Sequence, residues 1–292
     1  MNIRDLLQNV IDNQGSDLHL TVGAPPVVRI DGKLKPIGEQ DPFTPTDVEN
    51  LVFSILSAEQ KEMLMMNKEL DFSFAYGDVA RFRVNAFHQR GYLAAALRLI
   101  PFKIPTLEEL NLPASLYDFG LLPQGFVLVT GPTGQGKSTT IAALLNYINE
   151  SRNLHIVTIE DPIEYIYPHR KSLVDQRELH LDTHSWEIAL RSVLREDPDV
   201  VLIGEMRDYE TISSAITIAE TGHLVFASLH TNSAAQTIDR IIDVFPENQQ
   251  RQVRVQLSSI LEGVISQRLV PAIGGGRVPV VEIMKASAAV RT

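Results

Sequence analysis

The residues best suited to chemistry in this sequence form one glycine-rich motif. Residues 131–139 read GPTGQGKST, which matches the pattern G-x-x-x-x-G-K-[ST]. Glycines let backbone N–H groups turn toward phosphate oxygens, and the start of a helix adds a favourable partial charge. Lys137 can reach the β and γ phosphates of a nucleotide, and the Ser138 hydroxyl can ligate Mg²⁺. The residues expected to bind ATP are Gly131, Pro132, Thr133, Gly134, Gln135, Gly136, Lys137, Ser138 and Thr139.

The motif also has the neighbours that a phosphate loop needs. The apolar residues 126–130 predict a strand directly before it, and residues 139–149 predict a helix directly after it. A glycine-rich turn without a ligand would not require strand, lysine, serine and helix in this order. We therefore expect the segment to bind the phosphates of a nucleotide.

Carboxylates follow two later apolar segments, at the point where each predicted strand ends. In an open α/β sheet these carboxyl ends border the ligand crevice. Glu205 ends a segment typical of a Walker B strand, where it could hold Mg²⁺ through water. Glu160, Asp161 and Glu164 follow residues 156–159, and a carboxylate here could orient or deprotonate the attacking water. The spacing leaves the choice among these three open, because Glu160 and Asp161 could also cap the next segment of the chain.

Two histidines bracket another apolar segment, residues 224–229. His230 lies at its predicted carboxyl end and could sense the γ-phosphate, whereas His223 precedes it. A histidine is more often a structural residue. A functional role is favoured here because the segment follows the phosphate loop and both carboxylate segments in chain order.

The second part of the chain must position these residues. Over residues 114–292, short runs that are apolar on both faces alternate with helical segments, which is typical of buried parallel strands in an α/β sheet. Residues 101–113 contain three prolines and predict a linker.

Residues 1–100 predict a smaller mixed α+β domain. An amphipathic helix at residues 3–11 precedes a hairpin that turns at Asp31-Gly32, and one helix is expected from Thr46 to about Met66. Two further strands turn near residues 89–91. Alternation in the first of them places Arg81, Arg83 and Asn85 together on one exposed face.

Composition excludes several classes of protein. The 292 residues carry a net charge of −10, from 26 Lys and Arg against 36 Asp and Glu, which argues against nucleic acid as the main partner. The chain has no cysteine, so disulfides and thiolate zinc sites are absent. No apolar run approaches the ~20 residues that span a bilayer, and the first residues do not resemble a secretory signal. A nucleic-acid translocase is therefore disfavoured, whereas a nucleotide-gated scaffold that hardly hydrolyses ATP stays open.

The order of the motifs resembles one family. The segments GPTGQGKST, TIEDPIE, REDPDVVLIGEMRD and TGHLVFASLHT are similar to the Walker A, Asp box, Walker B and His box of the secretion and pilus ATPase superfamily. The segments SDLHL, RIDG and ARFRVNAF resemble the N-terminal domain of its type IV pilus retraction members. The resemblance implies a PAS-like N-terminal domain, a RecA-like ATPase domain, and a motor whose ATP hydrolysis powers pilus retraction and twitching motility.

Two features bear on the branch of this family. Pilus extension and type II secretion ATPases usually have a longer N-terminal region and a four-cysteine zinc module, so the cysteine-free sequence favours the retraction branch. The last residues resemble the beginning of a retraction motif, and the family's C-terminal helical region is expected to be truncated. We expect nucleotide binding to persist without that region.

The resemblance also implies roles for single residues. Glu164 is expected to be the catalytic base, Glu205 the Walker B glutamate, and His223 and His230 the His box. Arg83 and Arg98 are expected to reach the phosphates of a bound nucleotide.

The family further implies an assembly and a place in the cell. We expect a homohexamer with ATP and Mg²⁺ between subunits, and an inner-membrane pilus platform protein as partner. The location is expected to be cytoplasmic, with membrane association only through partners. Gln135 stands where the family often has Ser, and we expect it to matter little because backbone groups bind the phosphates there.

Overall fold

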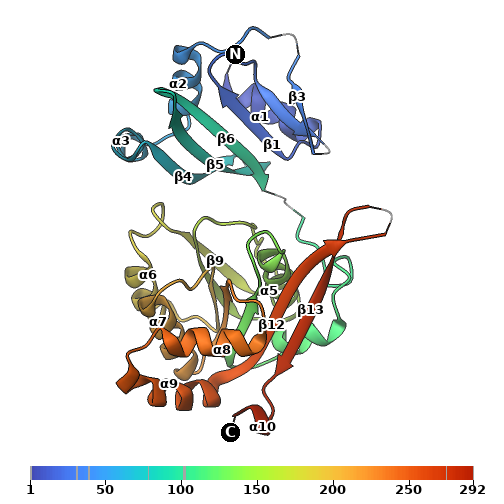
Figure 1. Ribbon diagram of the computed structural model, residues 1–292, viewed down its shortest axis with the longest axis vertical. Helices are drawn as coiled ribbons and strands as arrows, with labels where there is room; N and C mark the ends of the chain where they lie inside the picture. Colours follow the sequence, from blue (N-terminus) through green and yellow to red (C-terminus); the bar gives the residue numbers. More distant parts are fainter. Residues whose placement is uncertain are drawn as a thin grey trace. The chain divides into compact units, whose positions relative to one another are not determined.

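The computed structural model describes residues 2–30, 32–38, 40–77, 79–100, 103–273 and 275–291. The chain divides into two compact units, Met1–Phe102 and Lys103–Thr292 (Figure 1). The α/β class predicted for the chain is confirmed. None of the helices in the described ranges is long and apolar enough to cross a membrane.

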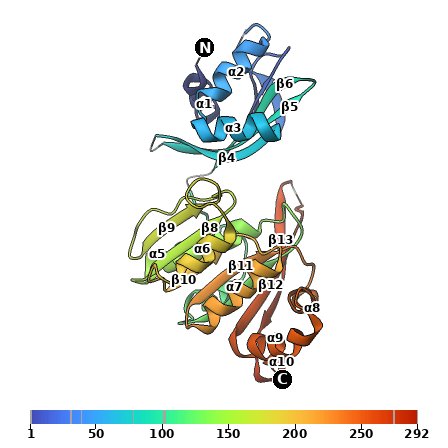
Figure 2. The same cartoon turned by 90° about the vertical axis from the view of Figure 1, so that its left-hand side faces the viewer.

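The first unit is an antiparallel sheet with helices packed on one face (Figure 2). The helices bury apolar residues at helical spacing, such as Leu6, Leu7 and Val10, against the sheet residues Phe82 and Leu97. In chain order the elements are α1 (Ile3–Asp12), β1 (Asp17–Thr21), β2 (Val27–Ile30), β3 (Lys33–Pro36), α2 (Pro45–Phe53), α3 (Ala58–Asn67), β4 (Glu69–Tyr76), β5 (Ala80–Gln89) and β6 (Tyr92–Ile100), and the sheet order is β3-β2-β1-β6-β5-β4.

Capping residues separate α2 from α3, so the prediction of one helix from Thr46 to Met66 was wrong. The Thr44 side chain accepts a hydrogen bond from the Asp47 amide at the start of α2. The Ser57 side chain caps α3 in the same way. A serine that bonds to backbone amides competes with helix continuation, which explains the break.

The hairpin of β5 and β6 agrees with its predicted pattern. Phe82, Val84 and Ala86 are buried, and the turn residues Arg90 and Gly91 have φ of 52° and 82°. The opposite face, with Arg81, Arg83 and Asn85, is half-buried and therefore less open than predicted. For the predicted turn at Asp31-Gly32, Asp31 lies outside the described residues.

The second unit contains a mainly parallel sheet in the order β13-β12-β7-β11-β10-β8-β9. Among the described strand pairs of this second sheet, only that of β13 with β12 is antiparallel. The four strands predicted from apolar runs are present, while β9, β12 and β13 were not predicted. The bounds are β7 (Gly125–Thr130), β8 (His155–Glu160), β9 (Leu173–Glu178), β10 (Val200–Ile203), β11 (Leu224–Leu229), β12 (Leu261–Pro271) and β13 (Arg277–Lys285).

Helices cover both faces of this sheet and form two cores. One face packs against α5 (Lys137–Ser151) and α4 (Tyr117–Gly120), which follows the short helix η1 (Ala114–Leu116). The other face packs against α6 (Trp186–Val193), α7 (Tyr209–Glu220), α8 (Ala234–Asp243) and α9 (Glu247–Ile260), and α10 (Ala288–Arg291) follows β13.

Residues 103–113 belong to the second unit, although they were predicted as part of a linker. Ile104, Leu107 and Leu112 are buried in the same core as α5. Their apolar side chains therefore decide the packing of this proline-containing segment.

Candidate nucleotide site

The phosphate loop connects the end of β7 to the start of α5 and has a backbone that glycine permits. Gly131, Gly134 and Gly136 have φ of 144°, 75° and 78°. A Cβ on Gly131 would also lie 2.3 Å from the backbone oxygen of Gln267 on β12. Glycine is therefore required at position 131 by both conformation and space.

Lys137 is the first residue of α5 and is buried, with 7% of its surface exposed. Its Nζ donates to the backbone oxygens of Gly131 at 2.8 Å and Pro132 at 3.1 Å. Burial lowers the pKa of Lys137, and the charges of Glu205 and Glu164 act in the opposite direction. Both predicted catalytic carboxylates thus act electrostatically on the lysine of the phosphate loop.

His230 connects Lys137 to Glu205. Its Nδ1 lies 3.3 Å from Lys137 Nζ, and its Nε2 lies 2.8 Å from Glu205 Oε1. Because an ammonium group only donates, Nδ1 must accept from Lys137, and Nε2 then carries the proton that it donates to Glu205. The structure therefore brings together Lys137, His230 and Glu205, the residues predicted to be the Walker A lysine, a His-box histidine and the Walker B glutamate.

Glu205 is held in its charged form by two neighbours. Burial would raise its pKa, but Arg207 and His230 outweigh burial and hold the pKa below the ordinary value. The Arg207 Nη2 lies 2.8 Å from Glu205 Oε2. A carboxylate remains available at this position at neutral pH.

The three carboxylates after β8 lie in different surroundings. Glu160 is buried, accepts from Thr158 Oγ1 at 2.7 Å, and has a pKa that burial raises to about 7. Asp161 is exposed, and its charge acts on Arg207. Glu164 is half-buried, and its charge acts on Lys137. These surroundings are more compatible with the predicted role of catalytic base for Glu164 than for Glu160 or Asp161.

His223 lies at the amino end of β11, whereas the phosphate loop lies at the carboxyl ends of the strands. It precedes β11, and its Nδ1 lies 3.0 Å from the Ile218 oxygen. The start of β11 pairs with the start of β7, whereas the phosphate loop follows the end of β7. The six residues of β11 therefore separate these two ends of the sheet by ~20 Å. Within one subunit, His223 therefore does not join His230, contrary to the grouping of the two in one site.

The candidate arginines belong to the first unit. Arg83 and Arg98 are paired in register on β5 and β6. Arg98 Nε donates to Asp17 Oδ1 at 2.8 Å. The role of these two arginines toward a nucleotide stays a prediction.

Gln267 is a component of the site that sequence reasoning missed. It projects from β12, is only 3% exposed, and donates through Nε2 to the Gln135 backbone oxygen at 2.7 Å. Its Oε1 accepts from Thr140 Oγ1 at 2.6 Å. The Gln135 side chain accepts from the Leu269 amide at 2.7 Å. Gln135, from which little was expected, thus fixes the phosphate loop to β12.

Together, the glycine-rich loop between β7 and α5, the Glu205 carboxylate linked to it through His230 and the mainly parallel sheet define a P-loop ATPase. The chain belongs to the type II/IV secretion system protein family, whose model matches residues 76–278. The family predicted from the motifs is therefore confirmed.

Individual relatives place the chain more narrowly. It is 50% identical over 291 residues to the type IV pilus retractation ATPase PilT of Pseudomonas aeruginosa, covering 100% of this chain and 84% of the relative. It is 51% identical over 267 residues to a twitching motility protein of Neisseria gonorrhoeae, covering 91% and 71%.

Solved structures agree with these relatives. A crystal structure of the pilus retraction motor PilT with bound ADP matches with a TM-score of 0.94 at 52% identity, over 100% of this chain and 85% of the other. The ATPase DotB of Legionella pneumophila matches with a TM-score of 0.89 at 29% identity, over 98% and 81%. The predicted succession of an N-terminal domain and a C-terminal ATPase domain agrees with the first of these.

Proposed function

We propose that this chain is a Mg²⁺-dependent ATPase that drives retraction of type IV pili, and hence twitching motility. The observation that carries the proposal is the meeting of Lys137, His230 and Glu205 at a phosphate loop. The 50% identity to a pilus retractation ATPase over the full chain supports the biological assignment.

The phosphate loop would bind ATP through its backbone amides and Lys137. In the structure, the Lys137 ammonium donates to two loop carbonyls and His230, so it is already directed into the loop. Phosphate oxygens would replace these acceptors and bring Lys137 onto the β and γ phosphates. The loss of the Lys137–His230 contact would then alter the hydrogen bond that His230 Nε2 makes to Glu205.

The residues at the loop fit Mg²⁺ bound together with a nucleotide. Among the described residues, no group of three or more acidic or histidine side chains could hold a metal alone. Ser138 would ligate Mg²⁺ directly and Glu205 through water, which suits an ion that keeps several waters and phosphate oxygens. When bound, Mg²⁺ would neutralise charge that develops on the phosphates.

Glu164 would act as the base that orients and deprotonates the attacking water. Its charge already acts on Lys137, and it is less buried than Glu160. Arg83 and Arg98 would contact the nucleotide of a subunit interface, so that phosphate loss changes their contacts and couples hydrolysis to domain movement.

The assembly implied by the family is a homohexameric ring. The ring would act on a platform protein of the inner membrane from the cytoplasmic side. Membrane association would then occur only through that partner.

The test is Mg²⁺-dependent ATP hydrolysis over a range of protein concentrations, beside Lys137→Ala. We expect the rate per subunit to rise with concentration and to vanish in the variant, as required by a site shared between subunits. Unchanged turnover in Lys137→Ala would overturn the site. ATP binding without hydrolysis at every concentration would instead identify a nucleotide-gated scaffold.

A further inference from the structure

The loop that carries Glu164 is held by side chains at several points. We call residues 161–167 the Glu164 loop. The Ile163 amide donates to Glu178 Oε2 at 3.1 Å, and the Glu164 amide donates to Glu160 Oε2 at 3.4 Å. The backbone around Glu164 is therefore fixed by two carboxylates that come from β8 and β9.

Gln176 on β9 joins the two ends of this loop. Its Oε1 accepts from the Tyr167 amide at 2.9 Å, and its Nε2 donates to the Tyr165 backbone oxygen at 2.7 Å. The same Nε2 lies 3.3 Å from Glu160 Oε1, at the residue just before the loop. One amide side chain thus contacts the backbone after Glu164 and the carboxylate before it.

Tyr165 connects the Glu164 loop to the phosphate loop. Its hydroxyl lies 2.9 Å from Thr139 Oγ1, two residues after Lys137 on α5. The Tyr165 ring packs against the core that contains α5. The residue that follows Glu164 is therefore bonded directly to the segment that binds phosphates.

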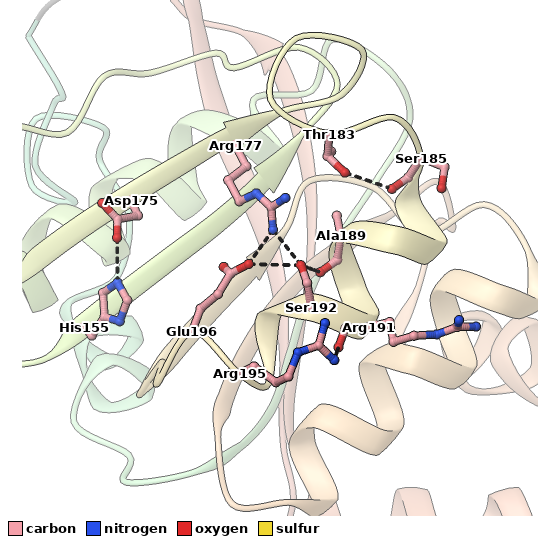
Figure 3. Close-up of polar contacts among 10 residues, drawn as sticks. All are labelled: His155, Asp175, Arg177, Thr183, Ser185, Ala189, Arg191, Ser192, Arg195 and Glu196. Atoms are coloured by element: carbon pink, nitrogen blue, oxygen red, sulfur yellow. Dashed lines mark hydrogen bonds and ion pairs between the residues drawn. The ribbon is translucent and has the colours of Figure 1, made fainter.

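The strand that supplies Gln176 is itself anchored on its opposite face (Figure 3). Arg177 Nη1 donates to Ser192 Oγ at 2.8 Å and pairs with Glu196 near α6. His155 Nε2 lies 3.0 Å from Asp175 Oδ2. Because strand side chains alternate, these contacts hold β9 without touching the face that carries Gln176.

We propose that Tyr165 and Gln176 are positioning residues for Glu164, an inference that rests on the proposed function. Gln176 fixes the shape of the Glu164 loop, and the Tyr165–Thr139 hydrogen bond fixes its distance from the phosphates. A base must lie within hydrogen-bond reach of the attacking water, so a displacement of about 1 Å costs up to ~10²-fold in rate.

The first experiment removes one hydroxyl by Tyr165→Phe. We expect kcat for ATP hydrolysis to fall about tenfold, while KM for ATP and the Kd for ADP stay within about twofold. Tyr167→Phe is the matched control, because it makes the same change on the same loop, at a residue whose hydrogen bond to Gln176 is made by the backbone amide and is kept in the variant. We expect the control to hydrolyse ATP at the wild-type rate.

The second experiment separates positioning from a general structural effect. Gln176→Leu is expected to lower kcat at least as much as Tyr165→Phe. Either change introduced into Glu164→Gln should then lower the residual rate no further, because a positioning residue acts only through the base it places. A structural effect would lower the rate in both backgrounds equally.

The outcomes distinguish the inference from the proposed function. If Glu164→Gln hydrolyses ATP at the wild-type rate, the role of the base is wrong and the inference fails with it. If Glu164→Gln hydrolyses ATP far more slowly than wild type while Tyr165→Phe matches wild type, only the positioning role is overturned. Equal losses in Tyr165→Phe and Tyr167→Phe would overturn it as well.

Discussion

Arg83 and Arg98 lie directly opposite each other on β5 and β6, so two guanidinium side chains share one face of the first unit's sheet. Like charges in such a cross-strand pair are unfavourable. Asp17, in register with Arg98 on β1, offsets them by accepting from Arg98 Nε at 2.8 Å. Burial would raise the pKa of Asp17, but Ser16 and Arg98 outweigh it and lower the pKa below its ordinary value.

Asp17→Asn should destabilise the first unit by about 1–2 kcal/mol at pH 7, because it removes the charged partner of Arg98 and of Arg29, whose Nε atoms lie 2.8 and 3.8 Å from the Asp17 carboxylate. A lowered native pKa gives stability that is present above pH ~4 and lost as the pH falls further. The difference between wild type and variant should therefore shrink in acid. Amide hydrogen exchange in β1 and β6 measures it, and equal protection at pH 7 would contradict the prediction.

Glu160→Gln should change the pH dependence of stability in the second unit. Burial raises the pKa of Glu160 to about 7, so the native state keeps a proton that the unfolded chain releases above pH ~4.5. The contribution of Glu160 to the wild-type free energy of unfolding therefore falls by about 3 kcal/mol as the pH rises from ~4.5 to ~7. The variant should not show this loss. Urea unfolding followed by Trp186 fluorescence measures the free energy of unfolding at each pH. If wild type and Glu160→Gln show the same pH dependence, native Glu160 does not hold the extra proton.

His230→Ala and His223→Ala should differ, although both histidines lie next to β11. The first removes the link between Lys137 and Glu205, and we expect kcat to fall about tenfold or more. The second removes a hydrogen bond to Ile218 and should cost about 1 kcal/mol of stability, with an unchanged Kd for ADP. Steady-state kinetics and nucleotide titration separate them. Weaker ADP binding in His223→Ala would place that residue at the phosphates after all.

Gln135→Ser should loosen the phosphate loop. The change leaves the Leu269 amide without its side-chain acceptor, which should cost about 1 kcal/mol and weaken ADP binding several-fold. Gln135→Glu keeps an acceptor oxygen and is the matched control. Calorimetric ADP titration of both variants is the measurement, and wild-type affinity in Gln135→Ser would show that the backbone alone holds the loop.

The parts of the site that could be predicted from the sequence are those in which residue type and local order suffice. The phosphate loop is such a case, because Gly131, Lys137 and Ser138 have fixed roles between a strand and a helix. Glu160 and Glu164 could not be separated by spacing, since burial distinguishes them and burial depends on the packing of β9.

Other features depend on contacts between distant segments. Gln267 reaches the phosphate loop because β12 pairs with β7, a pairing that no local pattern indicated. The position of His223 could have been inferred, because the residues before and after one strand lie at opposite ends of that strand. The separation of α2 from α3 could likewise have been inferred from Ser57, because serine is a preferred N-cap residue and caps α3.

The placement of β12 has a mechanical consequence. Gln267 bonds the phosphate loop, and Glu262, five residues earlier, forms an ion pair with Arg291 of α10 at 2.7 Å. The strand between them is hydrogen-bonded on both sides, by β7 and β13, and five residues span ~17 Å. If the phosphate loop were displaced along the direction of β12, the strand would move as one piece and would shift α10, ~17 Å away, without any change of secondary structure.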